Sequence, residues 1–380
     1  MTTKFVLAHD IGTTGDKATL FDESGNLVGS AYEEYPTYLP ETNWAEQDAN
    51  DWWKAVVKST RRLIQETKVH QKDIVAVGFS GQMMALLPVD SDGAPLIPAL
   101  IHMDGRSARE SERLMKTVGK EAIYRITGNI LDPHYTITKI VWLKEHMPEV
   151  YARTYKILQS KDYVAYKLTG RLGTTDPSDA SLMLLYDIVE HKWSEEIMNE
   201  LGVPMSILPD VLKSTDIQGY VTKDAAEATG LLEGTPVIVG GGDGVCATVG
   251  SGALMKGKAY NYIGGSSWVA IHDDKPMFDR EMRFFSCCSM KDGAYDMFGT
   301  MLCAGSSFEW ARRELGVVEE FAARHLGDNV YDLLGKTAAK ASPGAGGIIF
   351  MPHLMGERAP LWDPSAKGVF YGLSLMTTRS

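Results

Sequence analysis

The sequence predicts an α/β protein of two domains, and three observations lead to this fold class. At 380 residues the chain is longer than one ordinary domain, so two domains with a cleft between them are expected. Apolar, β-branched runs occur together with amphipathic helical segments along the chain. Two distant segments also share one plan, in which a strand runs into Ile-Gly, small hydroxyl residues and a returning strand.

The first of these segments lies near the N-terminus. Lys4–Ala8 predicts a strand, Lys17–Phe21 predicts the returning strand, and the turn is rich in small and hydroxyl residues: Asp10, Gly12, Thr13, Thr14 and Gly15. Backbone N–H groups and two threonine hydroxyls in such a turn suit a chain of phosphate oxygens, and Lys17 adds a positive charge. An ordinary tight turn is the alternative interpretation.

The second segment has the same form. Tyr260–Ile263 predicts a strand, Trp268–His272 predicts its return, and the turn consists of Gly264, Gly265, Ser266 and Ser267. Two such hairpins facing one cleft would hold a polyphosphate from both sides.

The stretch VIVGGGDG, Val237–Gly244, predicts a buried strand that ends in a glycine turn carrying one carboxylate, Asp243. Its three glycines are expected to remove every side chain that could block a ligand. Val245–Gly250 is expected to open a helix. Because a helix N-terminus keeps a carboxylate ionised, Asp243 is a candidate general base.

Two further strand ends carry polar residues. Ile74–Ser80 leads into Gln82, Met83 and Met84, where Gln82 could contact a hydroxylated ligand, and packing of the methionines is the alternative. The segment Ala99–Arg106 offers His102 and Asp104 as ligand contacts, with a structurally satisfied histidine and a common Asp-Gly turn as the alternatives.

Other segments are expected to be structural. Helices are expected over Asn50–Gln65 (with its tryptophans in the core), Thr138–His146 and Lys161–Gly170, and from Ser306. Asp176–Asp179 predicts a polar loop of capping residues, and an ordering salt bridge at a turn is the structural alternative for the Glu357-Arg358 pair. Gly252–Lys258 has the spacing of a Walker loop, but Ala259 stands where Ser or Thr is required, so a turn is expected.

Composition and charge exclude some classes of function. A formal net charge of −11 argues against nucleic-acid or anionic-membrane binding as the main role. The four cysteines show no metal-ligand spacing and favour a reducing compartment. Phe5–Ala8 is too short for the core of a signal peptide, and no apolar run approaches membrane-spanning length, so a cytoplasmic location is expected.

Together these residues resemble the FGGY family of carbohydrate kinases, and within it the xylulokinases. The resemblance covers nearly the whole chain and rests on motifs in order: DIGTTGDK at Asp10, WAEQD at Trp44, GQM at Gly81, MDGR at Met103, GGGD at Gly240, the Gly264 loop and GERAPLWDPSAKGVFYGL. It implies two actin-like, ribonuclease H-like domains around a cleft, residues 1–250 and 251–380. Because family members continue past FYGL into a glycine-rich signature that holds adenosine, the second domain is expected to be truncated.

The resemblance also implies roles for single residues. Asp243 would be the catalytic base that deprotonates the sugar hydroxyl, and Asp10 would help to hold Mg²⁺. One phosphate loop would be lined by Thr13, Thr14 and Lys17, and the other by Gly264, Gly265 and Ser266. The sugar would meet Gln82, Met83, Met84, His102, Asp104 and Trp268.

Two departures from the xylulokinase pattern leave the substrate open. Met84 replaces the usual His of Gln-Met-His, and His102-Met103 replaces a Trp-Asn pair before Asp104. The expected function is ATP-dependent phosphorylation of D-xylulose or a related ketose or polyol. The alternatives are an FGGY kinase for gluconate, glycerol, erythritol or fuculose, a truncated, non-catalytic sugar-binding protein, and a nucleotide-dependent oxidoreductase suggested only by the glycines near Asp243. The expected partners are the sugar and ATP, without nucleic acid or membrane, and a homodimer is an open alternative for assembly.

Overall fold

The structure is a computed structural model that describes residues 3–363 and 365–378. Its contacts divide the chain into two units. Unit 1 runs to Lys258 and also contains His272–Phe278 and Phe285–Met297. Unit 2 contains Ala259–Ile271, Asp279–Phe284 and the chain from Phe298 onward. The domain boundary predicted at residues 250/251 stays a prediction.

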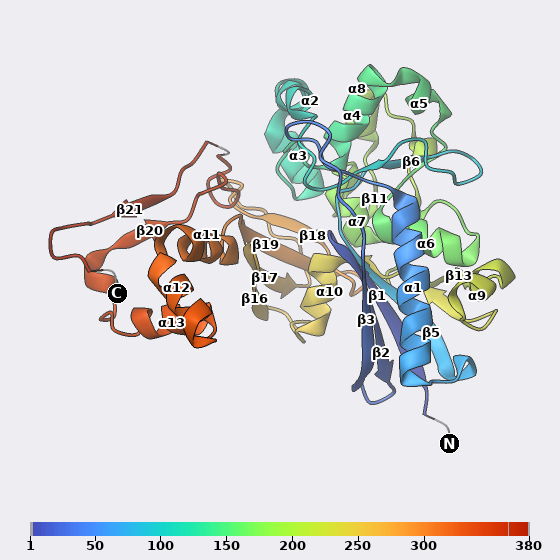
Figure 1. The fold of residues 1–380 in the computed structure, drawn as a ribbon. Coiled ribbons are helices and arrows are strands. Elements are labelled where there is room, and N and C mark those ends of the chain that lie inside the picture. The colour runs from blue at the N-terminus through green and yellow to red at the C-terminus, as the bar shows by residue number, and fades with distance from the viewer. Residues whose placement is uncertain (1–2, 364, 379–380) are drawn as a thin grey trace. The chain divides into compact units, whose positions relative to one another are not determined.

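Unit 1 is built on a seven-stranded mixed sheet (Figure 1). Its strands are β1 (Phe5–Ile11), β2 (Gly15–Asp22), β3 (Leu27–Glu34), β5 (Ile74–Gly81), β13 (Ile217–Tyr220), β14 (Pro236–Ile238) and β15 (Gly241–Gly242). The order is β13-β14-β5-β1-β2-β3, with β15 also pairing with β5. Strands β1, β14 and β15 run parallel to β5, whereas β1 and β2 form the predicted antiparallel hairpin, with Asp10 opposite Lys17. The α/β class predicted from the sequence is thereby confirmed.

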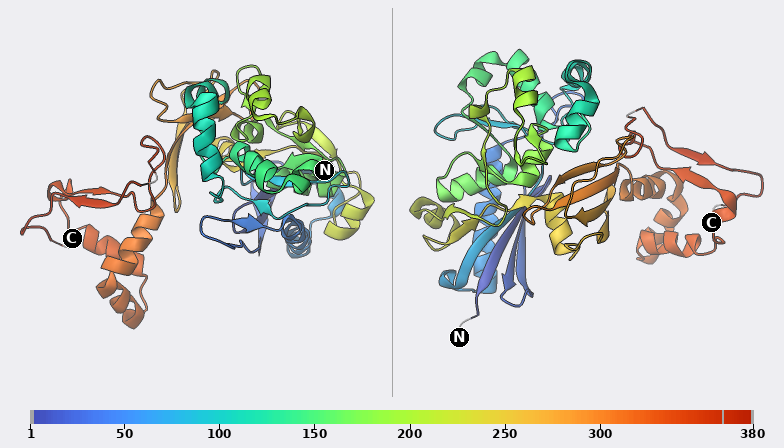
Figure 2. Two further views of the ribbon diagram at one scale, coloured as in Figure 1. Left: turned by 90° about the horizontal axis from the view of Figure 1, so that it is seen from above. Right: turned by 180° about the vertical axis from the view of Figure 1, so that it is seen from behind.

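Two helices pack against this sheet, and a third packs against both of them (Figure 2). Helix α1 (Ala49–Thr67) contacts β2 and β3, and α6 (Ser160–Thr169) contacts β5, β13 and β14, with α9 (Lys223–Thr229) beside both helices. The Asp48 carboxylate caps α1 by accepting the N–H of Asn50. Trp52 is fully buried and Trp53 packs against the core, so both tryptophans are structural, as predicted.

The remainder of unit 1 consists of shorter elements. The helices are α2 (Ala108–Leu114), a π-helical turn (Met115–Gly119), α3 (Lys120–Thr127), α4 (Thr136–His146), α5 (Pro148–Arg153), α7 (Pro177–Leu182), α8 (Glu195–Leu201) and α10 (Asp243–Gly250), with 3₁₀ turns at Gln71–Asp73 and Met205–Ile207. The strands are β4 (Glu46–Gln47), β6 (Leu87–Val89), β7 (Ala99–Leu100), β8 (Lys156–Leu158), β9 (Thr174–Thr175), β10 (Tyr186–Asp187), β11 (Lys192–Trp193), β12 (Asp210–Val211) and β18 (Phe285–Cys288).

One prediction in this region is wrong. The expected polar loop at Asp176–Asp179 is instead the start of α7, because Asp176 accepts the N–H groups of Ser178 and Asp179 while Pro177 occupies the first helical position. Proline is pre-organised for that position, so the pair is a helix start signal. The capping role expected of Asp176 is confirmed.

Unit 2 contains most of the second predicted hairpin, which is confirmed as the antiparallel pair β16 (Ala259–Ile263) and β17 (Ser267–Asp273), with β17 ending in unit 1. The later elements are β19 (Tyr295–Met301), which begins in unit 1, α11 (Gly305–Leu315), α12 (Val317–Leu326), α13 (Val330–Ala338), a 3₁₀ turn (Ala345–Gly347) and the antiparallel pair β20 (Ile349–Met351) and β21 (Val369–Tyr371). The alternative of a Glu357-Arg358 salt bridge is wrong: Glu357 accepts the N–H groups of Leu302 and Arg358 and pairs with His353.

Among the described helices, none combines the length and the apolar character needed to cross a membrane.

Candidate functional site

Three parallel strands of unit 1 end at the same edge of the sheet. Asp10 of β1 and Gly241 of β15 both stand opposite Ser80 of β5. The Ser80 hydroxyl donates to Asp10 Oδ1 at 2.8 Å, and Asp243 follows β15 directly. Ligands of open α/β sheets bind at the carboxyl ends of strands, so this edge is the candidate site.

A buried pair of side chains orients the β1–β2 hairpin beneath this edge. His9 and Asp16 are fully buried and meet at 3.0 Å, and the Ser59 hydroxyl of α1 donates to the same carboxylate. Side chains alternate along a strand, so Asp10 and Lys17, which follow them, point to the opposite face. Buried polar contacts of this kind fix the register in which Asp10 is presented.

The glycine turn before Asp243 serves protein packing. Gly240 has φ +76°, and a Cβ there would lie 2.2 Å from the Phe79 carbonyl oxygen. A Cβ on Gly242 would lie 2.3 Å from both Sδ and Cε of Met83. The interpretation that these glycines leave room for a ligand is therefore wrong for Gly240 and Gly242, because backbone and side-chain atoms of the protein occupy that space.

Asp243 is the first residue of α10 and accepts the N–H of Gly244 at 2.7 Å. Asp243 is exposed to solvent, yet desolvation by the surrounding protein and the charge of Asp10 raise its pKa to about 6. The helix N-terminus was expected to hold this carboxylate ionised, but the two raising effects outweigh its amides. A carboxylate with this pKa is mostly ionised at neutral pH and is well matched to accept a proton.

The predicted phosphate loop lies beside Asp10 in unit 1. Thr13 and Thr14 form the turn between β1 and β2, and Lys17 is exposed on β2. The Thr13 carbonyl accepts an N–H of Gln47, while the Thr14 hydroxyl bonds to Tyr32. The Thr14 carbonyl also accepts the N–H of Tyr35, so the backbone of both threonines is held in place, as a pre-organised phosphate site requires.

The second loop belongs to unit 2 and is fastened to helix α11. The Gly264 carbonyl accepts the N–H of Gly305, and the Gly265 carbonyl accepts the N–H and the hydroxyl of Ser306. Ser266 completes the turn by accepting the Gly264 N–H through its carbonyl. Trp268 stacks on Tyr262 and donates its indole N–H to Tyr260, so its ring is held against β16.

The predicted sugar residues after β5 have different surroundings. Gln82 is buried and donates to Gln47, while its own Oε1 has no donor among the described residues. Met83 packs on Gly242, beside Asp243. Met84 adopts φ +64°, which is unusual for a residue with a side chain and often marks a functional site. These three residues therefore adjoin the strand edge that carries Asp10.

His102 and Asp104 differ in accessibility. His102 is half-buried, whereas Asp104 is fully buried and accepts the N–H of Ala45 and the Arg106 guanidinium. Arg106 also pairs with Glu46 and lies over the Trp44 ring at 3.6 Å. A sugar contact for Asp104 stays a prediction, and its present bonds are all to protein groups.

The sequence analysis missed two residues that hold these segments. Ser80 bonds to Asp10, and its signal was a hydroxyl at the end of an apolar strand. Lys139 of α4 is fully buried and donates to the carbonyls of Met84 and Ile101, which joins the two segments predicted to meet the sugar. No sequence signal distinguishes this lysine, because it lies within a helical pattern.

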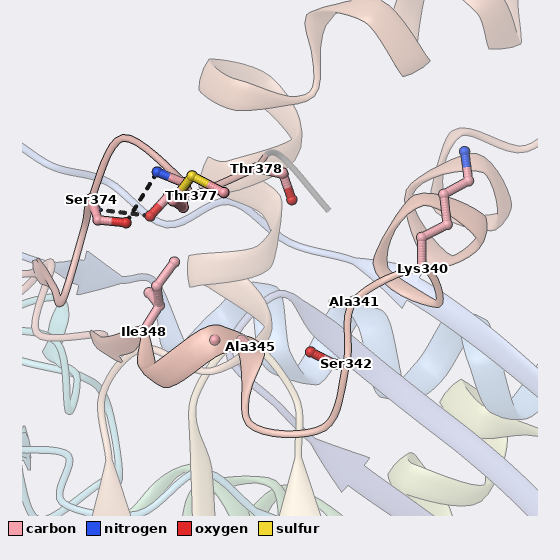
Figure 3. A pocket seen from close by; sticks show the side chains of 10 residues that line it. Lys340, Ala341, Ser342, Ala345, Ile348, Ser374, Thr377 and Thr378 are labelled. Atoms are coloured by element: carbon pink, nitrogen blue, oxygen red, sulfur yellow. Dashed lines mark hydrogen bonds between the residues drawn. The ribbon is translucent and has the colours of Figure 1, made fainter.

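Other sites are less suited to the predicted chemistry. A hollow of about 290 Å³ in unit 2 is lined by Lys340, Ser342, Ser374 and neighbouring residues, and it contains none of the predicted site residues (Figure 3). Within the described residues, three potential metal-binding side chains cluster only at Glu110, Glu145 and His146 on α2 and α4. Asp10 and Asp243 belong to no such group of three among the described residues, although the charge of Asp10 acts on Asp243.

Comparison with known proteins gives matches along the whole chain. The model of the FGGY family of carbohydrate kinases, N-terminal domain, matches residues 5–250, and that of the C-terminal domain matches residues 260–380. A xylulose kinase of Staphylococcus xylosus is 30% identical over 99% of this chain and 75% of its own length. A gluconokinase of Bacillus subtilis is 32% identical over 98% of this chain and 72% of its own length.

A solved structure gives the same result. The ligand-bound xylulose kinase from Lactobacillus acidophilus matches with a TM-score of 0.91 and 28% identity, covering 99% of this chain and 74% of that one. The two-domain α/β fold predicted from the sequence is thereby confirmed. Both domain models match, the second over residues 260–380, and the chain spans about three quarters of the length of these relatives.

Proposed function

This chain belongs to the FGGY family of carbohydrate kinases and is a carbohydrate kinase, and on that premise we propose that it transfers the γ-phosphoryl group of ATP to a hydroxyl of D-xylulose. The observation that carries the proposed chemistry is the position of Asp243. It follows β15 at the strand edge shared with Asp10, and its pKa is raised to about 6.

In the proposed reaction, Asp243 accepts the proton of the sugar hydroxyl while the hydroxyl oxygen forms a bond to the γ-phosphorus. The bond from that phosphorus to the β,γ-bridging oxygen breaks, and ADP leaves with the electron pair. Thr13, Thr14 and Lys17 bind phosphate oxygens in this proposal. Phosphoryl transfer depends mainly on positioning and charge neutralisation, which a fixed loop beside a fixed base supplies.

The donor set at this edge fits Mg²⁺. Ser80 donates to one Asp10 oxygen, and no described residue donates to the other. Asp10 and Asp243 interact electrostatically, so two hard oxygen donors lie near each other. Mg²⁺ typically takes one or two carboxylates, with water and substrate phosphates completing its shell. Bound there with ATP, the ion would neutralise phosphate charge.

A neutral sugar suits the predicted substrate residues better than a sugar acid. The buried Oε1 of Gln82 lacks a donor among the described residues, and a sugar hydroxyl could supply one. Among these residues only His102 has a basic side chain, and the neighbouring Arg106 guanidinium already pairs with Asp104 and Glu46. Gluconate is the second candidate, because the gluconokinase of Bacillus subtilis is as similar as the xylulose kinase.

The test measures ADP release with Mg²⁺ and ATP against D-xylulose, D-gluconate, glycerol, erythritol and fuculose. We expect D-xylulose to give the highest kcat/KM. Asp243→Asn should lower kcat by about 10²–10⁴-fold, the usual contribution of a general base. The matched control is Asp92→Asn, which makes the same change in an exposed turn.

Two outcomes would refute separate parts of this proposal. A higher kcat/KM for gluconate than for D-xylulose would refute D-xylulose as the preferred substrate, but it would not affect the proposed role of Asp243 as the base. Activity of Asp243→Asn close to that of Asp92→Asn would remove Asp243 from its role.

A further inference from the structure

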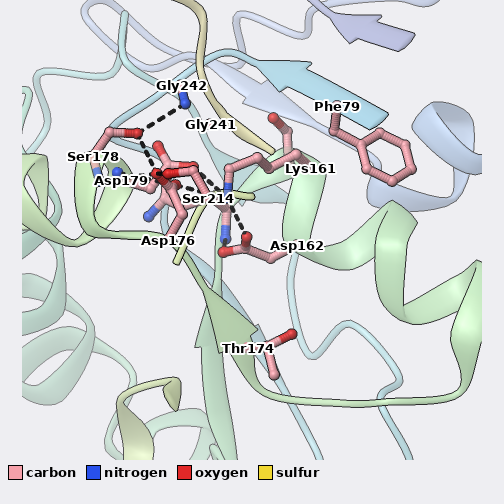
Figure 4. Close-up of polar contacts among 12 residues, drawn as sticks. Phe79, Lys161, Asp162, Thr174, Asp176, Ser178, Asp179, Ser214, Gly241 and Gly242 are labelled. Atoms are coloured by element: carbon pink, nitrogen blue, oxygen red, sulfur yellow. Dashed lines mark hydrogen bonds and ion pairs between the residues drawn. The ribbon is translucent and has the colours of Figure 1, made fainter. Parts of the chain in front are cut away.

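Behind the glycine turn lies a group of charged side chains that takes no part in the proposed reaction (Figure 4). Lys161 of α6 is fully buried, and its Nζ lies 2.7 Å from Asp162, 3.0 Å from Asp176 and 3.1 Å from Asp179. Isolated buried charges are costly, so a lysine in such a place must be paired. Packing alone therefore does not explain why four ionisable residues lie together inside unit 1.

The charges within this group are unequal. Burial lowers the pKa of Lys161, but its three acidic neighbours outweigh that effect and leave the pKa well above the usual value. Burial and the other carboxylates raise the pKa of Asp179 well above its usual value, although the neighbouring Lys161 lowers it.

Asp176 uses its charge to hold two serine hydroxyls. Its Oδ2 accepts the hydroxyl of Ser178 at 2.6 Å and that of Ser214 at 2.9 Å. A hydroxyl has one proton, so Ser178 oxygen is left with lone pairs only, and it accepts the N–H of Gly242 at 3.0 Å. Ser214 accepts the N–H of Gly240 through its backbone carbonyl, also at 3.0 Å.

Both ends of the glycine turn are therefore bound to residues that Asp176 holds. Gly242 is the N-cap of α10, and Asp243 is the next residue. Hydrogen bonds to a charged group are stronger than neutral ones, and a chain of them in a buried place polarises and rigidifies its members. A base must be held within a fraction of an ångström to act in a proton transfer.

We propose that Asp176, paired with Lys161, is a positioning residue for Asp243, acting through Ser178 and Ser214 on the turn Gly240–Gly242. The proposal rests on Asp243 being the base. Because all these side chains are buried, they cannot act by contact with the substrate or with phosphate. The proposal gives these buried charges a role that needs no such contact.

The test compares two buried serines of helix α7. Ser178→Ala removes the acceptor of the Gly242 N–H. The control, Ser181→Ala, removes an equally buried hydroxyl that accepts the N–H of Cys288 and donates to Pro177. If the Ser178 hydroxyl had only a structural role, both variants should have the same kcat.

We expect Ser178→Ala to lower kcat by about 10–10²-fold, the effect of a small misplacement, with KM for sugar and ATP changed less than about threefold. Ser181→Ala should keep kcat within about twofold. In the Asp243→Asn background Ser178→Ala should have no further effect on kcat, because residues that act as a unit are not additive.

A second measurement needs no activity. In hydrogen–deuterium exchange, Ser178→Ala should speed exchange in residues 240–246, whereas Ser181→Ala should leave that segment unchanged. If the wild-type protein phosphorylates none of the sugars, the proposed function is refuted. The exchange measurement still tests whether Ser178 holds the segment that carries Asp243. Wild-type kcat and wild-type exchange in Ser178→Ala would overturn the inference. Should that variant not fold, Ser214→Ala is measured with the same expectations, since its hydroxyl reaches the same Asp176 oxygen.

Discussion

At the scale of single residues, the properties of Asp243 follow from its neighbours. Burial is the larger cause of its raised pKa, and repulsion by Asp10 is the next. Repulsion between like charges disfavours ionisation, while the N–H of Gly244 acts in the opposite direction. The neighbours of Asp243 therefore bring its pKa close to neutral by disfavouring the ionised carboxylate.

The first prediction concerns this electrostatic coupling. Asp10→Asn removes the repulsion, so the pKa of Asp243 should fall from about 6 toward its usual value while burial keeps it raised in part. The pKa is measured by ¹³C NMR titration of labelled aspartate carboxyls, without substrate. In the wild-type enzyme the acid limb of kcat/KM should lie near pH 6. An unchanged Asp243 titration in Asp10→Asn would contradict the coupling.

The second prediction concerns stability. The pKa of Asp243 is higher in the folded than in the unfolded protein. The contribution of its protonated form to folding stability is therefore fully present below about pH 4 and is lost as pH rises through about 6. Asp243→Asn is neutral at every pH and retains an oxygen for the Gly244 N–H. It should therefore raise the unfolding midpoint at pH 8 and leave it nearly unchanged at pH 4. Thermal unfolding at both pH values checks this, and a lower midpoint at pH 8 would refute it.

At the scale of elements, the turn between β14 and α10 joins the base to the predicted sugar segment through the Gly242–Met83 contact. A Cβ on Gly242 would lie 2.3 Å from the end of the Met83 side chain, so Gly242→Ala must displace that side chain. Overpacking of this kind costs about 1–3 kcal/mol. Gly78→Ala on β5 is the matched control, because a Cβ there meets no atom within 4 Å.

The third prediction is that Met83→Ala rescues Gly242→Ala. Urea unfolding of the single and double variants should give a coupling of about 0.5–3 kcal/mol, the range for residues in contact. Met83→Ala should not rescue Gly240→Ala, since the obstacle there is the Phe79 carbonyl at 2.2 Å and a positive φ. Additive effects for Gly242 and Met83 would contradict the packing argument.

At the scale of the whole molecule, local patterns predicted most elements but not the contacts between distant segments. Both hairpins, helix α1 and the strand before Asp243 follow from apolar periodicity and turn residues. Helix α7 also had a signal, the Asp176-Pro177 start, which was interpreted only as a cap.

The remainder depended on tertiary structure. The Lys161 group unites residues from α6 and α7, and Lys139 joins two segments 38 and 55 residues away from it in the chain. The purpose of the glycines was misjudged for the same reason: the atoms of Phe79 and Met83 that fill their space come from β5 and the segment after it. Sequence spacing carries no information about such neighbours.

The two units differ in how well their elements are buried, and this predicts where the chain opens first. Helix α13 buries none of its residues, and α12 buries only Glu319 and Ala323. Phe321 is 65% exposed and Leu326 is 69% exposed, whereas Trp52 and Val56 of α1 are fully buried. Elements with few buried apolar contacts open at low free-energy cost.

Limited proteolysis should therefore cut first within residues 317–338, at Phe321 with chymotrypsin and at Arg324 with trypsin, while residues 49–67 stay intact. Mass spectrometry of the first fragments checks this, and initial cleavage within α1 or β5 would show that burial does not set the order of opening.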